Sequence, residues 1–292
     1  MPTQKKFLLI INPIAGGNDK TELKEQVLQY ATEQWIEIIT YETTGKNDEA
    51  EIQKLYLEHV PSRILVAGGD GTIKLVGEAI GQHDVIVGIL PAGSANGLSV
   101  DLNLPADIEE ILQTAFHGKY IEMDMVSING KKSLHLSDLG ANAELIKNYE
   151  SGNVRGKLGY AIHAFTTYKE LGDPFNVSVT ANGETLHSEA RMVVIANTQK
   201  YGTGVTINPL GKMDDGKFEI VILKTLDLLF IGRILTGNMP VEDEEHVHII
   251  STEKALITTD VPVSFQIDGE FCGQETKLDV FILPRQMRVA VP

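Results

Sequence analysis

A short apolar segment that runs into a glycine-rich turn and then a helical pattern constrains this chain more than any other feature. Residues 65–67 have the apolar character of a strand, residues 68–72 are Gly-Gly-Asp-Gly-Thr, and residues 73–80 follow a helical pattern. Glycine lets a backbone approach a ligand closely, and the free N–H groups at a helix start favour phosphate. Asp70 stands where it could meet a metal ion that accompanies a nucleotide phosphate. By itself, the turn fits both a phosphate site and a tight strand-to-helix connection.

Two further glycine turns follow apolar strands. Residues 7–11 lead into Asn12-Pro13 and a loop that contains Gly16, and residues 85–90 lead into Pro-Ala-Gly-Ser-Ala-Asn-Gly at 91–97. Ligands of open α/β sheets bind beyond the carboxyl ends of the strands, which is where all three turns fall. We therefore expect the three turns to line one nucleotide site.

The order of these elements predicts an α/β fold for the first part of the chain. Continuous apolar runs are typical of parallel strands that are covered on both faces. Amphipathic helical stretches at 20–34 and 48–59 lie between the strands, so the pattern is βαβαβαβ. The chain contains neither Gly-x-x-x-x-Gly-Lys-Ser/Thr nor Gly-x-Gly-x-x-Gly. Their absence counts against the usual NTPase and dinucleotide-binding folds.

The pattern changes after Asp124, where short alternating strands replace the long apolar runs. Asn129-Gly130 and Asn182-Gly183 are typical hairpin dipeptides, and residues 154–171 predict a helix. Seven short strands are expected after the second hairpin, at 191–196, 218–223, 247–250, 255–259, 263–267, 278–283 and 287–291. This half predicts an antiparallel sandwich or flattened barrel. Because no linker separates the halves, we expect two packed domains with a cleft between them.

Three elements together carry a resemblance to a known family. Asn12-Pro13 with Gly16, residues 68–72 and residues 91–96 resemble the catalytic domain of diacylglycerol kinases, sphingosine kinases and their bacterial lipid-kinase relatives. The Gly-Gly-Asp-Gly-Thr element is shared with NAD kinases and 6-phosphofructokinases. The third turn and two acidic elements near the C-terminus narrow the resemblance to the lipid-kinase branch, and it spans nearly the whole chain in order.

The resemblance implies a two-domain fold like that of NAD kinases and diacylglycerol kinases, with an α/β Rossmann-like nucleotide-binding domain and an antiparallel β-sandwich domain. In the family the last strand returns to the first domain. Residues 1–125 with 285–292 are therefore expected to bind ATP, and residues 126–284 to bind the lipid. The implied activity is ATP-dependent phosphorylation of a hydroxyl on diacylglycerol or a related lipid, with Mg²⁺ as cofactor.

The family's nucleotide contacts map onto nine residues of this chain. They are Asn12, Gly16, Thr44, Gly68, Gly69, Asp70, Gly71, Thr72 and Ser94. Ser94 replaces the family's usual threonine and keeps the hydroxyl, whereas Leu75 departs from the usual glutamate. Glu78 lies one helical turn further on. The departure at Leu75 implies a weaker or altered nucleotide preference, or a non-catalytic member of the family.

The first acidic element, Asp-Gly-Glu at residues 268–270, resembles the catalytic element of the bacterial lipid kinases. We assign Glu270 as the general base, with Asp268 assisting it or binding catalytic Mg²⁺. Strand alternation puts Ile267 on the opposite face from Asp268, and Gly269 lets the backbone turn. Asp-Gly between apolar strands is also a strong hairpin signal, so a plain turn stays open.

The second acidic element, residues 210–218, matches a loop that holds a structural Mg²⁺ in the bacterial relatives. Carried over by position, the ligands are the carboxylate of Asp215 and the backbone carbonyls of Lys212 and Lys217. Oxygen ligands of this kind suit a hard cation. Asp124 matches a family aspartate that is linked through waters to this site and to Asp70. The alternative is a solvated Asp-Asp-Gly turn.

Composition limits the partners. With 25 basic and 40 acidic residues the net charge is −15, which argues against nucleic acid. A lipid kinase with this charge would touch an anionic membrane through a local patch. The apolar stretch 226–235 is one candidate, although a helix packed on the second domain's sheet is the favoured interpretation.

The expected location is the cytoplasm. The chain has no apolar run of about eighteen residues, its N-terminus enters a strand without a signal peptide, and its single cysteine, Cys272, fits a reducing compartment. We expect a cytoplasmic protein that contacts the membrane surface transiently and peripherally. A homodimer is compatible with this interpretation.

Two other functions stay open. One is a soluble-metabolite kinase of the NAD kinase type, which shares residues 68–71 but whose Asn-Glu nucleotide motif has no counterpart after the third turn. The other is a non-catalytic nucleotide- or lipid-binding relative, motivated by Leu75. The sequence also leaves the lipid open, because diacylglycerol, phosphatidylglycerol, ceramide and sphingoid bases share the hydroxyl and differ in the pocket shape they need.

Overall fold

The computed structural model describes residues 4–81, 83–141, 143, 173–201, 204–226, 233–234, 236–241, 243 and 245–292. The helix predicted at 154–171 lies outside the described residues, as does most of the apolar stretch 226–235. The chain divides into two compact units. Unit 1 is Met1–Met123 with Arg285–Pro292, and unit 2 is Asp124–Pro284.

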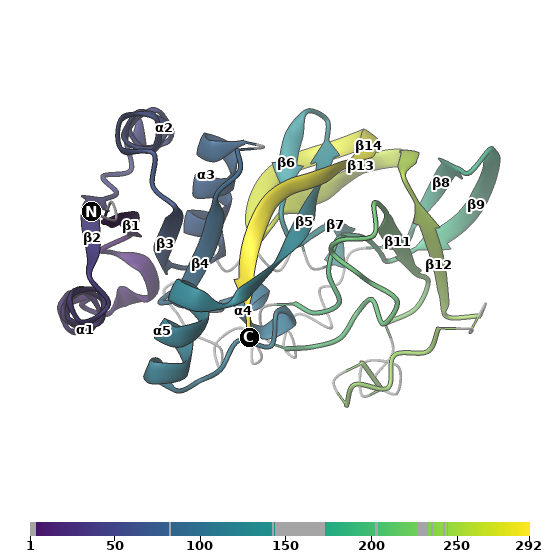
Figure 1. Ribbon diagram of the computed structural model, residues 1–292. Helices are drawn as coiled ribbons and strands as arrows, with labels where there is room; N and C mark the ends of the chain where they lie inside the picture. The colour runs from purple at the N-terminus through teal and green to yellow at the C-terminus, as the bar shows by residue number, and fades with distance from the viewer. Residues whose placement is uncertain are drawn as a thin grey trace. The chain divides into compact units, whose positions relative to one another are not determined.

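Unit 1 contains a parallel sheet in the order β2, β1, β3, β4 and the end of β14 (Figure 1). The strands are β1 (Lys5–Ile11), β2 (Ile36–Glu42), β3 (Arg63–Gly68), β4 (Ile86–Pro91) and the long C-terminal strand β14 (Glu270–Val291). The end of β14 joins the sheet through Arg288 and Val289, which pair in parallel with Ile86 and Val87. The chain's last residues therefore complete its first sheet.

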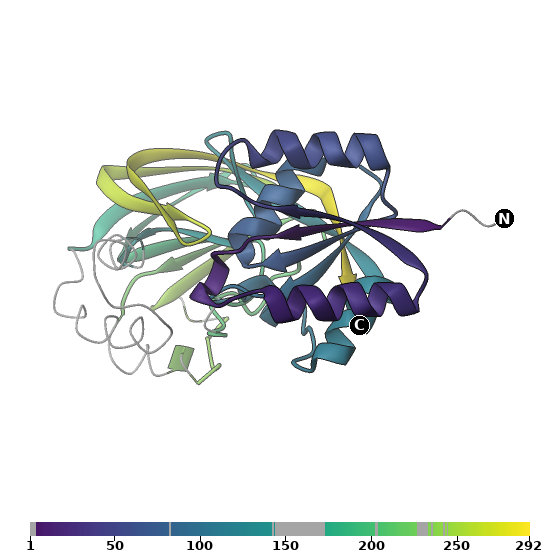
Figure 2. The same cartoon turned by 90° about the vertical axis from the view of Figure 1, so that its left-hand side faces the viewer.

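Helices cover both faces of this sheet, as Figures 1 and 2 show. On one face lie α1 (Thr21–Glu33) and α5 (Ile108–His117), and on the other lie α2 (Asp48–His59) and α3 (Asp70–Ile80). Leu9 of β1 packs in a core cluster with Val27 of α1 and Phe116 of α5. Its neighbours Leu8 and Ile10 are equally buried. Coverage on both faces explains why β1 has a continuous apolar sequence.

Unit 2 is antiparallel, with its strands in the order β12, β11, β10, β7, β13 and β14. Strands β8 and β9 extend from β13, and β5 pairs with β14 and β6. The strand bounds are β5 (Lys119–Ile128), β6 (Lys131–Ser133), β7 (Leu136–Gly140), β8 (Phe175–Ala181), β9 (Glu184–Ala190), β10 (Met192–Ala196), β11 (Phe218–Leu223), β12 (Val247–Thr252) and β13 (Lys254–Ile267).

Two core clusters cover opposite faces of the central strands of unit 2. Along β10, Val193 and Ile195 belong to one cluster, whereas Val194 and Ala196 belong to the other. Both faces of β10 are therefore buried, which explains its continuous apolar sequence in an antiparallel sheet. The prediction of a Rossmann-like α/β domain joined to an antiparallel β-sandwich domain is confirmed.

The predicted hairpins are also confirmed. Asn129-Gly130 joins β5 to β6, and Asn182-Gly183 joins β8 to β9. The φ angles are 49° and 82° in the first pair and 54° and 83° in the second. Two successive positive φ angles are typical of the type I′ turn, whose twist matches that of the flanking strands.

The end of unit 2 differs from the prediction of short strands. Residues 255–259 and 263–267 form the single strand β13, and residues 278–283 and 287–291 both belong to β14. Register shifts between Thr258 and Val263 absorb Pro262, which the sequence alone presents as a break. The predicted strand 191–196 begins one residue later, at Met192, and the strand 247–250 continues to Thr252. Within the described part of the chain, no helix is long and apolar enough to cross a membrane.

Candidate functional site

The three glycine turns of unit 1 are joined to one another. The side-chain amide of Asn12 donates to the hydroxyl of Thr72 at 3.1 Å, which links the first turn to the second. The carboxylate of Asp70 accepts from the backbone N–H groups of Gly97 (2.8 Å) and Leu98 (3.0 Å), which start α4 (Gly97–Asp101) after the third turn. The predicted turns therefore form one cluster at the carboxyl ends of β1, β3 and β4.

The close approach of the turns requires glycine at defined positions. A Cβ atom on Gly93 would lie 2.5 Å from the Cα atom of Gly69, and one on Gly69 would lie 3.1 Å from the Cα atom of Gly93. A Cβ atom on Gly16, whose φ is +63°, would lie 2.9 Å from the carbonyl oxygen of Ala92. A Cβ atom on Gly71 would meet nothing within 4 Å. Any need for glycine at position 71 would therefore come from a ligand.

The remaining residues of the second and third turns are fixed locally. Thr72 is buried against Gly68, where a Cβ atom would lie 2.5 Å from the Thr72 hydroxyl oxygen. The Asn96 side chain accepts from the N–H of Gly93 (2.8 Å) and donates to its carbonyl oxygen (3.1 Å). Ser94 is exposed on the turn that Asn96 closes. Its hydroxyl is accessible from solvent.

Thr44 lies on the same sheet edge, directly after β2. The preceding residue, Thr43, donates its N–H to the carbonyl oxygen of Ile11 at the end of β1 (2.8 Å). The N–H groups of Thr44 (2.8 Å) and Gly45 (2.7 Å) donate to the carboxylate of Asp48. Asp48 therefore fixes the loop that carries Thr44.

Asp48 and Tyr41 form a pair with opposed pKa shifts. Burial, the largest single cause, raises the pKa of Asp48, but the hydrogen bonds donated by Thr44, Tyr41 and Gly45 outweigh it and leave that pKa below its ordinary value of 3.8. Burial and the hydrogen bond to Asp48 raise the pKa of Tyr41 to about 12. Near neutral pH, Asp48 thus accepts as a carboxylate and Tyr41 donates as a neutral phenol.

A cavity of about 540 Å³ opens beside this loop. It is lined by Leu75 of α3 and by the loop and first turns of α2, through Gly45, Asn47, Asp48, Glu49, Ala50 and Gln53. Leu75 presents an apolar side chain where the family resemblance implies a glutamate. The departure at Leu75 therefore faces the loop that carries Thr44.

Lys20 was not singled out by the sequence, although it fixes the first turn. Its side chain is buried, and its Nζ donates to the carbonyl oxygens of Ala15 (2.7 Å) and Asn18 (2.8 Å). These bonds hold the short helix η1 (Ala15–Gly17) around Gly16. A lysine at the start of an amphipathic helix is normally solvated, so the sequence carries no signal for this role.

In unit 2, Asp268-Gly269 forms the hairpin between β13 and β14. Its φ angles of 50° and 87° match those of the two Asn-Gly hairpins, so the backbone is a plain type I′ turn. The Asp268 carboxylate accepts from the hydroxyl of Ser133 (3.0 Å) and from the N–H groups of Leu134 (2.9 Å) and His135 (2.9 Å). Asp268 thus ties the hairpin to the turn before β7.

Glu270, the first residue after that turn, is exposed. Among the described residues, its carboxylate makes no hydrogen bond or ion pair. Two buried polar residues behind the hairpin, Gln266 and Asp138, were missed by sequence reasoning. Gln266 stands between Phe265 and Ile267, and Asp138 precedes Leu139. These apolar neighbours are the signal that could have found them, because a buried polar side chain needs a partner.

The acidic loop predicted to hold Mg²⁺ contacts Asp124. Asp124 is 1% exposed; its carboxylate accepts from the N–H of Gly216 (2.7 Å), and its own N–H donates to the carbonyl oxygen of Met213 (2.7 Å). Asp215 is exposed and accepts from the N–H of Lys217 at 3.1 Å. The structure therefore brings Asp124 together with the loop that carries Lys212, Asp215 and Lys217.

No group of three His, Cys, Asp or Glu residues that could hold a metal occurs in the described part of the chain. The predicted Mg²⁺ site has one carboxylate and two backbone carbonyls, so it differs from a site made of three such side chains. The nucleotide candidates belong to unit 1, whereas Glu270, Asp268, Asp215 and Asp124 belong to unit 2. That the unit 1 residues and the unit 2 residues line one site, including the water-mediated link from Asp70 to Asp124, stays a prediction.

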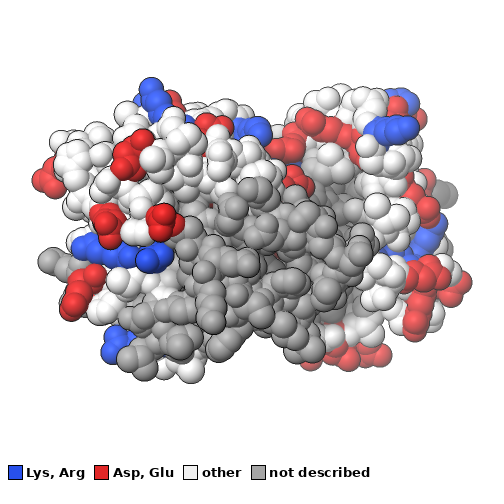
Figure 3. Space-filling view, turned by 180° about the vertical axis from the view of Figure 1, so that it is seen from behind, with Lys and Arg blue, Asp and Glu red and all other residues white. Residues whose placement is uncertain are grey.

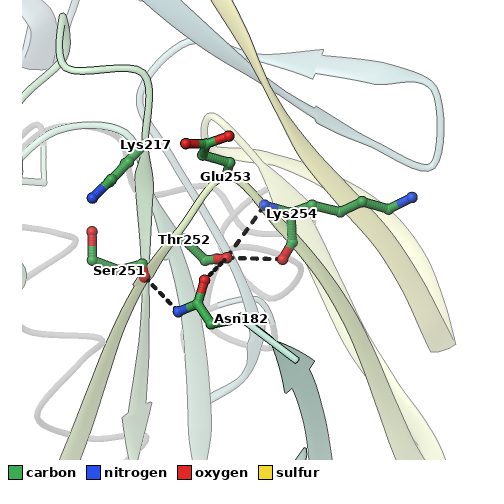
Figure 4. A pocket seen from close by; sticks show the side chains of 6 residues that line it. All are labelled: Asn182, Lys217, Ser251, Thr252, Glu253 and Lys254. Atoms are coloured by element: carbon green, nitrogen blue, oxygen red, sulfur yellow. Dashed lines mark hydrogen bonds between the residues drawn. The ribbon is translucent and has the colours of Figure 1, made fainter. Parts of the chain in front are cut away.

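A second cavity, of about 490 Å³, lies in unit 2 beside the β8–β9 hairpin (Figure 4). It is lined by Asn182, Lys217, Ser251, Thr252, Glu253 and Lys254. The Asn182 side chain donates to the carbonyl oxygen of Ser251 (3.0 Å) and accepts from the hydroxyl of Thr252 (2.9 Å). These bonds fasten the hairpin to the end of β12, and we assign them a structural role.

The chain is a two-domain protein that carries a cluster of glycine turns of the nucleotide-binding type on one unit and acidic turns on a β-sandwich unit. Residues 6–128 match the family described as the diacylglycerol kinase catalytic domain. Residues 136–291 match the YegS C-terminal NAD kinase beta sandwich-like domain. The chain belongs to the family of diacylglycerol kinases and YegS-type lipid kinases.

Individual relatives align with nearly the full length of this chain. A diacylglycerol kinase of Bacillus subtilis strain 168 is 26% identical over 92% of this chain and 91% of its own length. A protein of Enterobacter sp. strain 638 named probable lipid kinase YegS-like is 26% identical over 100% of this chain and 98% of its own. The crystal structure of a diacylglycerol kinase from Bacillus anthracis strain Sterne has a TM-score of 0.72 at 20% identity, covering 100% of this chain and 98% of that one. At this identity the structural likeness shows the fold alone.

Proposed function

We propose that the protein is an ATP-dependent lipid kinase that transfers the γ-phosphoryl group of ATP to a hydroxyl of diacylglycerol or a related lipid. The observation that carries the proposal is the cluster of three glycine turns at the carboxyl ends of parallel strands, joined by Asn12–Thr72 and by Asp70 to α4. Relatives named diacylglycerol kinase align with more than nine-tenths of the chain, which supports the same reaction.

In this proposal ATP binds to unit 1. Its phosphates lie at the start of α3, where the first-turn N–H groups and the helix dipole favour an anion. Gly71, which has open space around it, lets a phosphate approach the backbone. The side chains and backbone that contact the nucleotide belong to Asn12, Gly16, Thr44, Gly68, Gly69, Asp70, Gly71, Thr72 and Ser94.

Glu270 is the proposed general base. A lipid hydroxyl oxygen bonds to the γ-phosphorus while the bond from that phosphorus to the bridging oxygen breaks, ADP leaves, and Glu270 takes the hydroxyl proton. Its exposure and its lack of partners among the described residues suit this role. The Asp268 carboxylate already accepts hydrogen bonds from Ser133, Leu134 and His135, so we propose that it assists by holding the hairpin.

The residues of the acidic loop fit a hard cation. Asp215 offers an exposed carboxylate, the carbonyls of Lys212 and Lys217 accept no hydrogen bond from the described residues, and all three are oxygen ligands of the kind Mg²⁺ takes. Bound there, Mg²⁺ would supply positive charge and rigidity to the loop. The chain's own contribution is the buried Asp124, which holds Gly216 and Met213 in place.

The lipid substrate implies work at a membrane surface, and we propose a cytoplasmic protein that docks there transiently. On the face shown in Figure 3, the Lys and Arg side chains of the described residues lie among Asp and Glu side chains. With a net charge of −15, docking would depend on a small local patch rather than on the whole surface.

One assay tests the proposal. The purified protein is incubated with Mg²⁺, radiolabelled ATP and either vesicles containing diacylglycerol, phosphatidylglycerol, ceramide or a sphingoid base, or NAD. We expect label on a lipid. Label on NAD alone would establish the soluble-metabolite alternative. ATP binding without transfer to any acceptor would establish a non-catalytic relative and would implicate Leu75.

A further inference from the structure

We propose that Gln266 is a positioning residue that holds the Asp-Gly-Glu hairpin, and with it Glu270, through a buried chain of hydrogen bonds. The inference rests on the proposed function of Glu270 as the base. Gln266 does not touch the reacting atoms in this proposal, because its side chain is 1% exposed and lies behind the turn. It acts through the backbone of Gly269.

The chain of hydrogen bonds begins on β7. Asp138 is fully buried and faces Gln266 directly in the antiparallel register of β7 and β13. The Gln266 amide nitrogen donates to the carboxylate of Asp138, and the same carboxylate oxygen accepts from the hydroxyl of Tyr201 at 3.0 Å. The Gln266 amide oxygen accepts from the N–H of Gly269 at 2.7 Å. The hydrogen bonds thus run from Tyr201 through Asp138 and Gln266 to the N–H of the second turn residue.

The two partners of Gln266 determine which way its amide points. The Gln266 amide nitrogen faces Asp138 and its amide oxygen faces the backbone N–H of Gly269, which can only donate a hydrogen bond. A side chain between Asp138 and Gly269 must therefore donate at one end and accept at the other, as an uncharged amide does. Glutamate at this position would set two carboxylates against each other, and methionine would satisfy neither partner.

A comparison with the two Asn-Gly hairpins separates this role from ordinary turn chemistry. Asn129 and Asn182 tie their turns to neighbouring segments through the side chain of the first turn residue, as Asp268 does. Among the described residues, no side chain binds the N–H of Gly130 or Gly183. In the Asp268-Gly269 hairpin, the first residue is held through its own carboxylate, and the N–H of the second is held by the side chain of Gln266.

Holding both turn residues fixes the backbone next to Glu270. Glu270 pairs with Ile267 across the hairpin and immediately follows Gly269, so a shift of the turn would move its Cα atom. A displacement of about 1 Å can cost around a hundredfold in rate when a group must be aligned for reaction. The hydrogen bond from Gly269 to Gln266 therefore serves the position of Glu270, and the two Asn-Gly hairpins have no such bond among the described residues.

The test compares the wild type with Gln266→Met, Gln266→Glu and the double variant Gln266→Glu with Asp138→Asn. In the double variant, donor and acceptor are exchanged: the new amide at 138 donates to the new carboxylate at 266, which still accepts from Gly269. The Tyr201 hydroxyl, which donates to the same Asp138 oxygen in the wild type, would accept from that amide. Gln274→Met, at an exposed position on β14, is the matched control. Circular dichroism and thermal melting select the variants that fold.

We expect each single variant to lose about tenfold to a hundredfold in kcat for the lipid, with the KM for ATP unchanged. The double variant should recover most of that loss. The kcat of Gln266→Glu, expressed as a fraction of the wild-type kcat at the same pH, should rise as the pH is lowered and one of the facing carboxyls becomes protonated. A merely destabilised fold would not show this change in the ratio. Hydrogen exchange at the Gly269 amide should be at least about tenfold faster in Gln266→Met than in the wild type.

The outcomes separate the two proposals. A folded Gln266→Glu with wild-type kcat, or a folded double variant as impaired as the single one, would overturn the positioning role. Unchanged exchange at Gly269 would overturn it as well, whether or not the protein is active. A wild type that labels no lipid would instead overturn the proposed function and with it the catalytic purpose of the chain, while exchange still reports on the hydrogen bonds.

Discussion

The two units hold their candidate site residues by different means. In unit 1 the turns are joined by the side chains of Asn12 and Asp70, and they also touch through backbone atoms. A Cβ atom on Gly93 would overlap Gly69, and one on Gly16 would overlap Ala92. In unit 2 the acidic turns are held by buried polar side chains, such as Asp124 beside the acidic loop at 210–218 and Gln266 beside the Asp268-Gly269 hairpin. Unit 1 should therefore be sensitive to added atoms, and unit 2 to the loss of single polar groups.

The largest effect is expected at Glu270. Glu270→Gln keeps the size of the side chain and removes the proton acceptor, so turnover should fall by about two or more orders of magnitude. ATP affinity, measured by isothermal titration, should stay as in the wild type because the nucleotide candidates belong to unit 1. Glu189→Gln, at an exposed position on β9, serves as the control. Wild-type turnover in Glu270→Gln would remove this residue from the mechanism.

In unit 1, the sharpest contrast is between Gly93→Ala and Gly71→Ala. The methyl group at 93 would lie 2.5 Å from Gly69 and must push the turns apart, which costs on the order of 1–3 kcal/mol. The Tm should fall by about 2–4 °C per kcal/mol in a chain of this size. Gly71→Ala should keep or slightly raise the Tm of the free protein, because alanine fits a helix without strain. It should weaken ATP binding, because only the ligand would meet its methyl group. Gly69→Ala, with a 3.1 Å contact, should leave the fold intact and weaken ATP binding.

Two results would contradict the account of unit 1. If Gly93→Ala kept the wild-type Tm, backbone contact would not hold the turns. If Gly71→Ala bound ATP as tightly as the wild type, the second turn would be architectural at that position.

A third, smaller effect concerns the acidic loop. If Asp215 and the carbonyls of Lys212 and Lys217 hold a structural Mg²⁺, adding Mg²⁺ without ATP should raise the Tm, since a ligand of the native state alone stabilises it by about 2.7 kcal/mol at one hundred times its Kd. Asp215→Ala should abolish this rise and reduce catalysis indirectly through Asp124. The neighbouring exposed Asp214→Ala and the base variant Glu270→Gln should both keep it. An equal rise in Asp215→Ala would identify the loop as a plain turn.

The smallest effect tests Asp48, the carboxylate that holds the loop of Thr44 in unit 1. Asp48→Asn should lower the free energy of unfolding at neutral pH by on the order of 1 kcal/mol, because an amide accepts more weakly from Thr44, Gly45 and Tyr41. The folded-state pKa of Asp48 lies below its ordinary value of 3.8, so this stabilisation is present above that value and is lost as the pH falls through the folded pKa. Urea titrations at neutral and acidic pH should show the wild type and variant converging in acid. A constant difference across pH would assign the effect to shape instead of charge.

Much of unit 1 and the hairpins of unit 2 could be predicted because their signals are local. Asn129-Gly130 and Asn182-Gly183 adopt the turn that their residue types favour, and the strand predicted at 218–223 has those bounds. The long strands β13 and β14 could not be predicted, since Pro262 and Pro284 are local break signals that pairing with neighbouring strands overrides.

The order of residue types along the chain is enough to predict that three glycine turns follow three buried strands and that Asp268-Gly269 is a turn. Backbone conformation and side-chain periodicity depend on a few adjacent residues. The long-range contacts come from the fold: Asn12 meets Thr72 across 60 positions, Asp268 holds the turn at Ser133 across 135, and Gln266 meets Asp138 across 128. Such contacts depend on strand order and register, which one chain's pattern of residue types leaves open. The partners of the candidate catalytic hairpin are therefore properties of the fold.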